Sequence, residues 1–267
     1  MISKSERLLI FRFLFSKKSD GYVSIFAWFS IIGISLGVAA IIIVMSVMNG
    51  FRIDLTNRII GLNSHLNIYS FDNEITNKQA DELILNIDNS FFYQHYKSIE
   101  TNGLIIKSNN SKGVMIKGYD AYDKNHYLFN SINMGALIQN PKSEILIGDS
   151  LANEMNLNVG DKVKIAIPKT DKTILGNIPR FKTLEVVGVF DLGLYEYDSN
   201  LIFLSSELVR KLLLYDEDIY NKIEFFTSSP NEIELFKNKV ELETSNLLLN
   251  FYSISWKDQN KTLINAL

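Results

Sequence analysis

Residues 26–48 read FAWFSIIGISLGVAAIIIVMSVM, and this apolar stretch decides how the rest of the chain is interpreted. Around it, from Gly21 to Gly50, the chain has no Asp, Glu, Lys, Arg or His. A helix of about 20 apolar residues is long enough to cross the roughly 30 Å hydrocarbon core of a bilayer. The composition therefore predicts one transmembrane helix over residues 21–50.

A cleaved signal peptide is an alternative for the same stretch, since Val38 and Ala40 could be the small residues before a cleavage site. However, the apolar run continues past Ala40 through residues 41–45, and no polar segment precedes the cleavage position. These features favour a retained anchor.

Basic residues dominate the segment that precedes the helix. Residues 1–20 carry Lys4, Arg7, Arg12, Lys17 and Lys18, against the acidic Glu6 and Asp20. Loops on the cytoplasmic side of a membrane are enriched in Lys and Arg. Residues 1–20 are therefore predicted to be a cytoplasmic or interfacial basic segment, and residues 51–267 to lie outside the cytoplasm.

Small residues recur along the predicted helix at intervals of three and four. They are Ser30, Gly33, Gly37 and Ala40. This spacing places them on one helix face, where small side chains allow a second helix to approach closely. The pattern predicts a helix-packing face, although glycine is also common in membrane helices that have no such face.

Composition limits the function classes that the remaining chain can serve. The 267 residues are 46% hydrophobic and 21% charged, which is enough apolar material for an anchor and a domain with its own core. The formal net charge of -3 argues against nucleic-acid binding, which needs a basic excess. The absence of cysteine excludes thiolate catalysis and disulfides.

Mixed strand and helix patterns follow the apolar stretch and predict an α+β domain. After Asn49-Gly50, which could end or kink the first helix, residues 51–60 again read helical, with Gly61 as a stop. Strands are predicted over residues 64–70, 99–107, 112–118, 162–167, 182–190, 200–204, 222–226 and 251–256. Helix starts are predicted at Thr76 with Gln79, at Ser229 with Glu232, and at Ser205-Ser206 before residues 208–214.

Motifs for catalysis or metal binding are missing from the sequence. The histidines, His65, His95 and His126, are scattered without metal-ligand spacing, which favours structural or surface roles. No phosphate-binding loop, nucleophile elbow or dinucleotide fingerprint occurs. The acidic run at residues 216–218 reads as a solvated loop. We therefore predict no catalytic residue, no metal and no cofactor; an enzyme would need a pocket with convergent carboxylates or histidines.

Several blocks of the sequence resemble the LolC/LolE permease family. The resemblance rests on residues 21–25, 30–40, 46–52, 61–65, 147–152, 159–161 and 187–190, then on Gly193, Tyr195, Tyr197 and Asp198, and finally on Trp256, Asn260 and residues 266–267. It extends over essentially the whole chain.

The resemblance implies a permease subunit of a lipoprotein-releasing ABC transporter in the bacterial inner membrane. Such a permease transmits force and performs no bond chemistry. Its implied partners are a cytoplasmic ATPase, a second permease subunit, the lipoproteins and a periplasmic carrier. Residues 51–267 would then form a periplasmic domain of two subdomains, with residues 64–110 and 215–267 near the membrane and residues 111–214 inserted between them.

A protruding hairpin at residues 168–179, PKTDKTILGNIP, matches the carrier-binding element of the LolC branch. Alternation of Val163, Ile165 and Ile167 with lysines predicts a strand on the way in. The resemblance implies a site made of Ile174, Leu175, Gly176, Pro179, Lys164, Arg180, Phe181 and Lys182. Ile174 and Leu175 would be apolar anchors at the tip, although the loop could instead fold onto the domain. Phe181 departs from the family, in which this position is commonly polar.

Such permeases have three further membrane helices, so the sequence is expected to be a fragment of a longer protein. Two other functions stay open. Another mechanotransmitting permease would share the helix and the domain without the carrier-binding hairpin. A single-pass anchored periplasmic adaptor would bind its partner through the outer domain alone.

Overall fold

The computed structural model describes Glu6, Ile10 and residues 21–62, 64–122, 126–173 and 176–266. The chain divides into two compact units, Met1–Asn57 and Arg58–Leu267. We describe each unit by itself.

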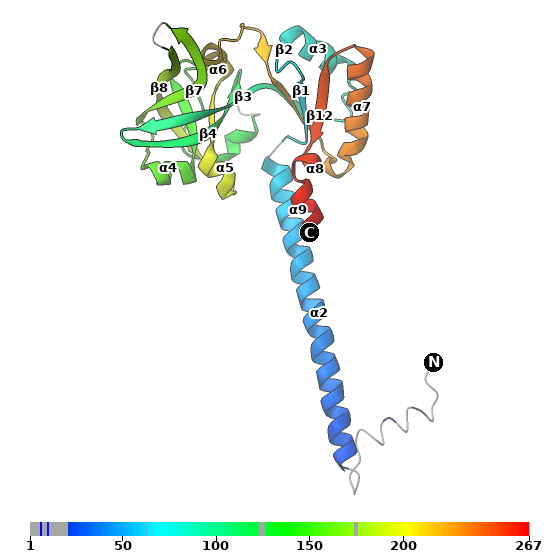
Figure 1. Ribbon diagram of the computed structural model, residues 1–267. Coiled ribbons are helices and arrows are strands. Elements are labelled where there is room, and N and C mark those ends of the chain that lie inside the picture. The colour runs from blue at the N-terminus through cyan, green and yellow to red at the C-terminus, as the bar shows by residue number, and fades with distance from the viewer. Residues whose placement is uncertain are drawn as a thin grey trace. The chain divides into compact units, whose positions relative to one another are not determined.

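Helix α2 spans Gly21–Leu62 without interruption (Figure 1). Asn49-Gly50 therefore does not end the helix. Its segment Ser24–Asp54 has a mean hydropathy of 2.7, and none of the window that defines it is buried. By length and composition this segment can cross a membrane, although a signal sequence near an N-terminus has the same properties.

Every strand predicted from alternation is present in the second unit. These strands are β1 Leu66–Ser70, β3 Gln94–Lys107, β4 Asn110–Tyr119, β7 Lys162–Thr173, β8 Gly176–Phe190, β9 Leu201–Ser205, β11 Lys222–Phe226 and β12 Phe251–Ser255. The strands that were not predicted are β2 Ile75–Thr76, β5 Ile132–Gly135, β6 Glu144–Gly148 and β10 Ile219–Tyr220. They are short, and β6 is an apolar run without alternation, so periodicity does not reveal them.

The strands form a mixed sheet of 10 strands in the order β12-β1-β11-β3-β4-β9-β6-β8-β5, with β7 paired to both β3 and β8. Pairs β4/β9 and β6/β8 are parallel, and the others in this sheet are antiparallel. Strands β2 and β10 form a separate two-stranded sheet. The predicted α+β class is confirmed.

The predicted subdomains contribute different strands of this sheet. Residues 64–110 and 215–267 supply the neighbouring strands β12-β1-β11-β3, and residues 111–214 supply most of β4 and strands β9, β6, β8, β5 and β7. Strand β3 pairs with β4 and β7 across this division. Because Arg58–Leu267 is one compact unit, the subdomain boundaries stay a prediction.

The second unit also contains short helices. They are α3 Asn77–Asn86, α4 Asp149–Met155, α5 Tyr195–Asn200, α6 Ser206–Leu213, α7 Ile233–Asn246, α8 Trp256–Gln259, α9 Lys261–Ala266 and the 3-10 turns η1 Tyr127–Ser131 and η2 Pro230–Glu232. Thr76 and Gln79 form the predicted capping box at the start of α3. Ser205 caps α6 by accepting from the Leu208 amide. Both predicted helix starts are confirmed.

The predicted cap at Ser229 is wrong. Its side chain makes no capping hydrogen bond, because the chain first forms the 3-10 turn η2 and the α-helix α7 begins only at Ile233. The Ser229 amide instead donates to the Thr227 hydroxyl. The Pro230 carbonyl in this turn accepts from the Trp256 indole at 2.8 Å, so a tertiary contact holds the turn.

Candidate functional site

Strands β7 and β8 form the predicted hairpin. They pair antiparallel from Lys162 opposite Glu185 to Thr173 opposite Gly176, with a register shift between Ile167 and Thr170. Pro179 lies opposite Thr170. The predicted anchors Ile174 and Leu175 lie outside the described residues, and so do the side chains of residues 168–179.

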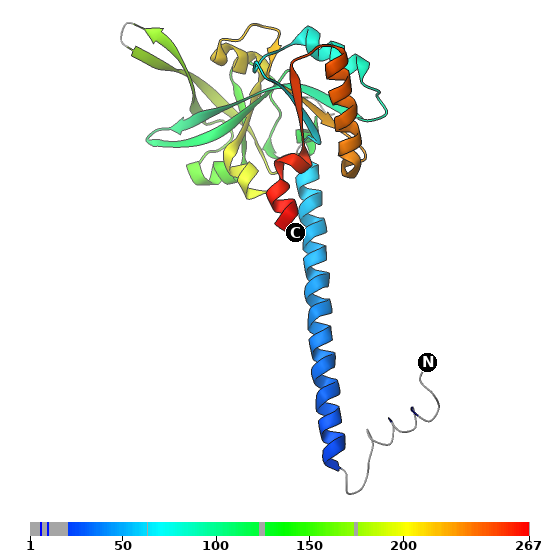
Figure 2. The same ribbon diagram turned by 45° about the vertical axis from the view of Figure 1, so that its right-hand side comes forward.

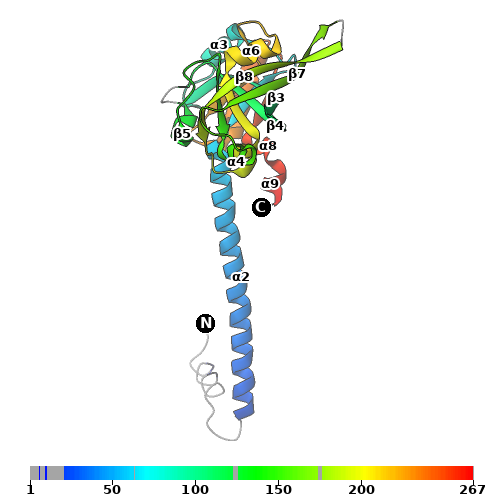
Figure 3. The same ribbon diagram turned by 90° about the vertical axis from the view of Figure 1, so that its left-hand side faces the viewer.

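The outer part of the hairpin leaves the sheet. Strand β3 pairs with β7 only at residues 164–166, and β6 and β5 pair with β8 only from Glu185 onward. Figures 2 and 3 both show the outer halves of β7 and β8 extending together away from the other strands. Within the described residues, the outer strand segments pair only with each other, so their outer edges carry no further strand.

Lys164 and Phe181 lie on one face of the hairpin root. Phe181 pairs with Ala166, and Lys164 pairs with Thr183, so alternation places both on the same side of the sheet. Phe181 is 54% exposed. Leu104 of β3 pairs with Ala166, continues this face and is 46% exposed. The structure thus brings Lys164 and Phe181 together on a partly apolar surface.

Arg180 and Lys182 lie on the opposite face. They pair with Ile167 and Ile165, which are buried, so they share the side that packs toward α6. Lys182 is exposed, whereas Arg180 is partly buried and donates to the Lys211 carbonyl at 3.0 Å. The resemblance groups Lys182 with Lys164 and Phe181, but the structure places it on the other side of the strand.

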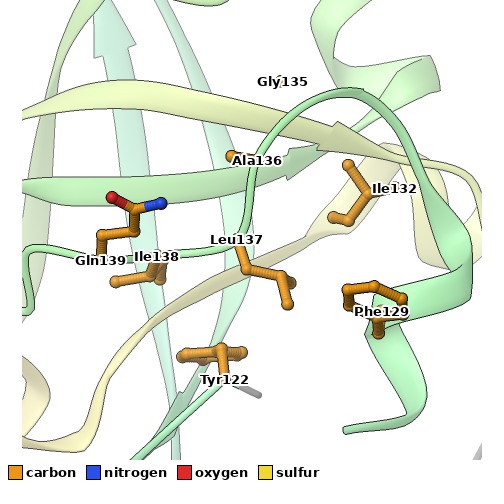
Figure 4. A pocket seen from close by; sticks show the side chains of 8 residues that line it. All are labelled: Tyr122, Phe129, Ile132, Gly135, Ala136, Leu137, Ile138 and Gln139. Carbon is orange, nitrogen blue, oxygen red and sulfur yellow. The ribbon is translucent and has the colours of Figure 1, made fainter. Parts of the chain in front are cut away.

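A pocket of about 560 Å³ lies in the segment that contains β5 (Figure 4). The side chains of Tyr122, Phe129, Leu137 and Ile138 border it, and Gln139 is a polar residue at its edge. The Tyr122 hydroxyl donates to the Leu204 carbonyl at 2.6 Å, so it is already engaged. The lining contains no acidic or basic side chain and supports apolar contact rather than proton transfer.

A buried group of charged side chains lies within the sheet, and the sequence did not predict it. The Lys222 ammonium lies 3.0 Å from Glu224 and 2.9 Å from Glu100, and the Lys117 ammonium lies 3.2 Å from Glu224. The Tyr119 hydroxyl donates to Glu224 at 2.5 Å. Charged residues at alternate positions of a strand usually indicate a solvent face, so their spacing alone did not suggest burial.

The charges in this cluster stabilise one another. Burial alone would raise the pKa of Glu224, but the ammonium groups of Lys117 and Lys222 hold it far below its usual value. Burial would likewise lower the pKa of Lys222, yet its carboxylate neighbours raise it well above the ordinary value. The ion pairs among these four side chains join β11, β3 and β4.

His65 has the structural role that the sequence predicted. It is buried, its Nδ1 accepts from the Thr227 amide at 2.8 Å, and its Nε2 lies 3.0 Å from the Ile60 carbonyl, to which it donates. Burial lowers the pKa of His65. Across the described residues, no group of three or more His, Asp or Glu side chains could hold a metal ion.

Asp198 is a buried residue of helix α5, which follows β8. It accepts from the Leu192 amide at 2.8 Å. Burial, together with the nearby negative charge of Asp191, raises the pKa of Asp198 to about 6. The folded protein therefore binds a proton here at a higher pH than the unfolded chain does, and the free energy of unfolding should fall as pH rises from about 4 to about 6.

We expect Asp198→Asn to weaken this pH dependence by about 2 kcal/mol between pH 4.5 and pH 7, because an amide can accept from Leu192 without a charge. Urea unfolding at pH 4.5 and pH 7 measures the effect. Asp216→Asn, in an exposed loop, is the control and should keep the wild-type dependence. Equal pH dependence in wild type and Asp198→Asn would contradict the assignment.

Similarity to known proteins identifies the family to which this chain belongs. The family model described as the MacB-like periplasmic core domain matches residues 27–241. The chain belongs to the MacB-like periplasmic core domain family. The match begins within α2 and ends within α7, so this family covers the hairpin and the buried charge cluster.

Within this family, the chain is similar to LolC proteins. It is 29% identical over 213 residues to the lipoprotein-releasing system transmembrane protein LolC of Neisseria meningitidis, a match that covers 78% of this chain and 51% of that protein. It is 25% identical over 261 residues to LolC of Buchnera aphidicola, covering 96% of this chain and 62% of that protein. These relatives confirm the predicted place in the LolC/LolE group.

A solved structure of the same family is also similar. The periplasmic region of MacB from Actinobacillus actinomycetemcomitans matches with a TM-score of 0.48 and 14% identity, covering 77% of this chain and 95% of that structure. The chain spans about half the length of the curated relatives that it matches first.

The residues predicted to pack against another helix lie on the membrane-crossing part of α2. Ser30, Gly33, Gly37 and Ala40 are all exposed. A Cβ added to Gly33 or Gly37 would meet no atom within 4 Å outside the local helix backbone. This face has room for a second helix, and its packing role stays a prediction.

Proposed function

We propose that this chain is part of a permease subunit of an ABC transporter that releases lipoproteins from the inner membrane and delivers them to a periplasmic carrier. The observation that carries the proposal is the similarity to LolC proteins, which extends from α2 through the whole second unit. In this function the chain transmits force and catalyses no reaction, and a separate cytoplasmic subunit hydrolyses ATP. Residues 1–20 face the cytoplasm, and Arg58–Leu267 lies in the periplasm.

The hairpin of β7 and β8 captures the carrier in this proposal. Its outer segments extend beyond the part of the sheet that pairs with other strands. Ile174 and Leu175 enter an apolar site on the carrier, since interface energy concentrates in a few buried anchors. Phe181 and Lys164 extend the contact along one face of the hairpin root, with Gly176 and Pro179 shaping the arm.

Titration of the full-length permease with its carrier tests the proposal. Deletion of residues 168–179 is expected to abolish binding, and Leu175→Ala should weaken binding by about 1–3 kcal/mol if the side chain enters a pocket. Ile174→Ala should act in the same direction. Lys182→Glu should mainly slow association, because exposed charges steer encounter. Undiminished binding by the deletion variant would remove the capture role.

The small-residue face of α2 is proposed to contact a helix of the second permease subunit. We expect the double variant Gly33→Leu/Gly37→Leu to weaken assembly by roughly 1–2 kcal/mol, because two large side chains prevent close approach. Co-purification of the partner subunits measures the effect. Leucine at Ser35 and Ala39, small residues on the opposite face of the helix, is the matched control, and equal recovery of partners with both variants would count against packing.

A second candidate function is that of a mechanotransmitting permease that does not release lipoproteins. It is favoured because the matching family model is named after MacB rather than after a lipoprotein-releasing protein. A permease of that kind would need the helix and the domain but no lipoprotein carrier. Release of a labelled lipoprotein from proteoliposomes, with ATP and carrier added separately, distinguishes the two functions. A single-pass adaptor would show neither release nor dependence on ATP.

A further inference from the structure

The hairpin arm leaves the sheet at one pair of residues. Ile167 and Arg180 are the last directly paired residues before the register shift, and beyond them β7 and β8 have no third strand beside them within the described residues. An interruption of the ladder bends a strand locally. The direction of the arm therefore depends on what holds this pair.

Arg180 is held by the end of helix α6. Its guanidinium donates to the Lys211 carbonyl at 3.0 Å. The last carbonyls of a helix have no partner within the helix, and a cation there also interacts favourably with the helix dipole. The amides of Leu214 and Tyr215 both donate to the Arg210 carbonyl instead. The Arg180 side chain thus caps a carbonyl that these two amides leave open.

Helix α6 is a firm point of attachment. Leu208, Val209, Leu212 and Leu213 are buried in the core of the domain. Arg210 forms an ion pair with Asp120 at 3.3 Å. A hydrogen bond from Arg180 to the backbone of this helix therefore fixes the hairpin root relative to the core of the domain.

We propose that Arg180 is a positioning residue that fixes the direction of the hairpin arm, rather than a residue that contacts the carrier. Lys182, on the same face, is the contrasting case, since it is exposed and carries the same charge. The planar guanidinium holds a fixed direction that the flexible ammonium of lysine does not. The importance of the arm direction for carrier capture rests on the proposed function. The hydrogen bond between Arg180 and α6 is independent of that function.

Amide hydrogen exchange in the full chain tests the tie without any carrier. We expect Arg180→Ala to speed exchange of the arm amides in residues 169–178 by about tenfold, because a charged hydrogen bond at the root is lost. Lys182→Ala should leave exchange unchanged, and Arg180→Lys should lie between wild type and Arg180→Ala. Equal exchange in Arg180→Ala and Lys182→Ala would overturn the proposal.

Spin labels give a second measurement that does not depend on local unfolding. The chain has no cysteine, so Lys172→Cys and Asn153→Cys, on β7 and α4, accept labels without background. Their distance distribution should broaden in Arg180→Ala and keep its width in Lys182→Ala. An unchanged width in Arg180→Ala would show that Arg180 does not set the direction of the arm.

Association kinetics with the carrier separate positioning from steering. Arg180→Ala should slow association by a similar factor at low and high salt, whereas the effect of Lys182→Ala should disappear at high salt because screening removes steering. An Arg180 effect that disappears with salt would make it a charge contact and overturn the proposal. If the wild-type protein does not bind the carrier, the proposed function is refuted. The hydrogen-exchange result then still decides the role of Arg180.

Discussion

Replacing Glu224 with leucine is expected to destabilise the domain by about 3–5 kcal/mol. Glu224 is 1% exposed and accepts from Lys117, Lys222 and Tyr119. Without the Glu224 carboxylate, Glu100 is the one carboxylate that the described part of the chain still places beside the ammonium groups of Lys117 and Lys222. An uncompensated buried charge is among the most costly defects in a protein core.

Urea unfolding followed by fluorescence measures this effect. The chain has two tryptophans, and Trp256 is 3% exposed, so a Trp28→Phe background isolates a probe within the domain. The double variant Lys222→Met/Glu224→Leu is the control, because it removes one cation with the anion and leaves Lys117 with Glu100. It should recover much of the lost stability. Equal destabilisation in both variants would contradict the charge-balance explanation.

The same cluster predicts a loss of stability in acid. The folded-state pKa of Glu224 lies below its ordinary value of 4.5 because Lys117 and Lys222 outweigh the effect of burial. The folded protein therefore holds fewer protons than the unfolded chain in this range. The contribution of Glu224 is complete above pH 4.5 and is lost as pH falls toward the folded-state pKa.

Gly148→Ala is the second change with a large expected effect, at about 3 kcal/mol of destabilisation. An added Cβ would lie 2.1 Å from the Asp198 carbonyl oxygen and 2.6 Å from its carbonyl carbon and Cα. These are backbone atoms of helix α5, so no side-chain rotation relieves the overlap. The end of β6 or helix α5 must move.

Gly113→Ala is the matched control for this prediction. Gly113 also lies in a strand of the same sheet, but an added Cβ there meets no atom within 4 Å. Urea midpoints of the two variants in the same background give the comparison. Similar midpoints would show that β6 and helix α5 adjust without cost and that the close approach is not required.

The sequence predicted the elements whose signals are local. The uncharged run of residues 26–48 predicted a membrane-crossing helix, since hydropathy does not depend on neighbours in space. Alternation predicted β3, β4, β7 and β8, and Thr76 with Gln79 predicted the start of α3. Ser229 shows the limit of such signals. Its sequence motif predicts a helix cap, but the chain forms a 3-10 turn there, and the Trp256 indole donates a hydrogen bond to that turn.

The candidate site was predicted in part, for the same reason. The hairpin strands followed from alternation and from the resemblance, and alternation alone places the neighbours Phe181 and Lys182 on opposite faces. Only the pairing register decides that Lys164 shares its face with Phe181. The tie between Arg180 and Lys211 joins residues 31 positions apart, and no local pattern reports it. From sequence position alone, Arg180 and Lys182 would be given the same role. Their surroundings in the structure differ.

The sequence by itself thus determined the anchor helix, the α+β class and the strands with clear alternation, because these depend on chemistry repeated along the chain. Only the tertiary structure decided the strand order and the buried charge cluster. Lys117 and Glu224 are 107 positions apart, and each reads as a solvent-facing residue until β11, β3 and β4 are placed side by side. Their burial is possible because opposite charges from distant strands meet there, and a pairing of that kind has no signature within any single segment.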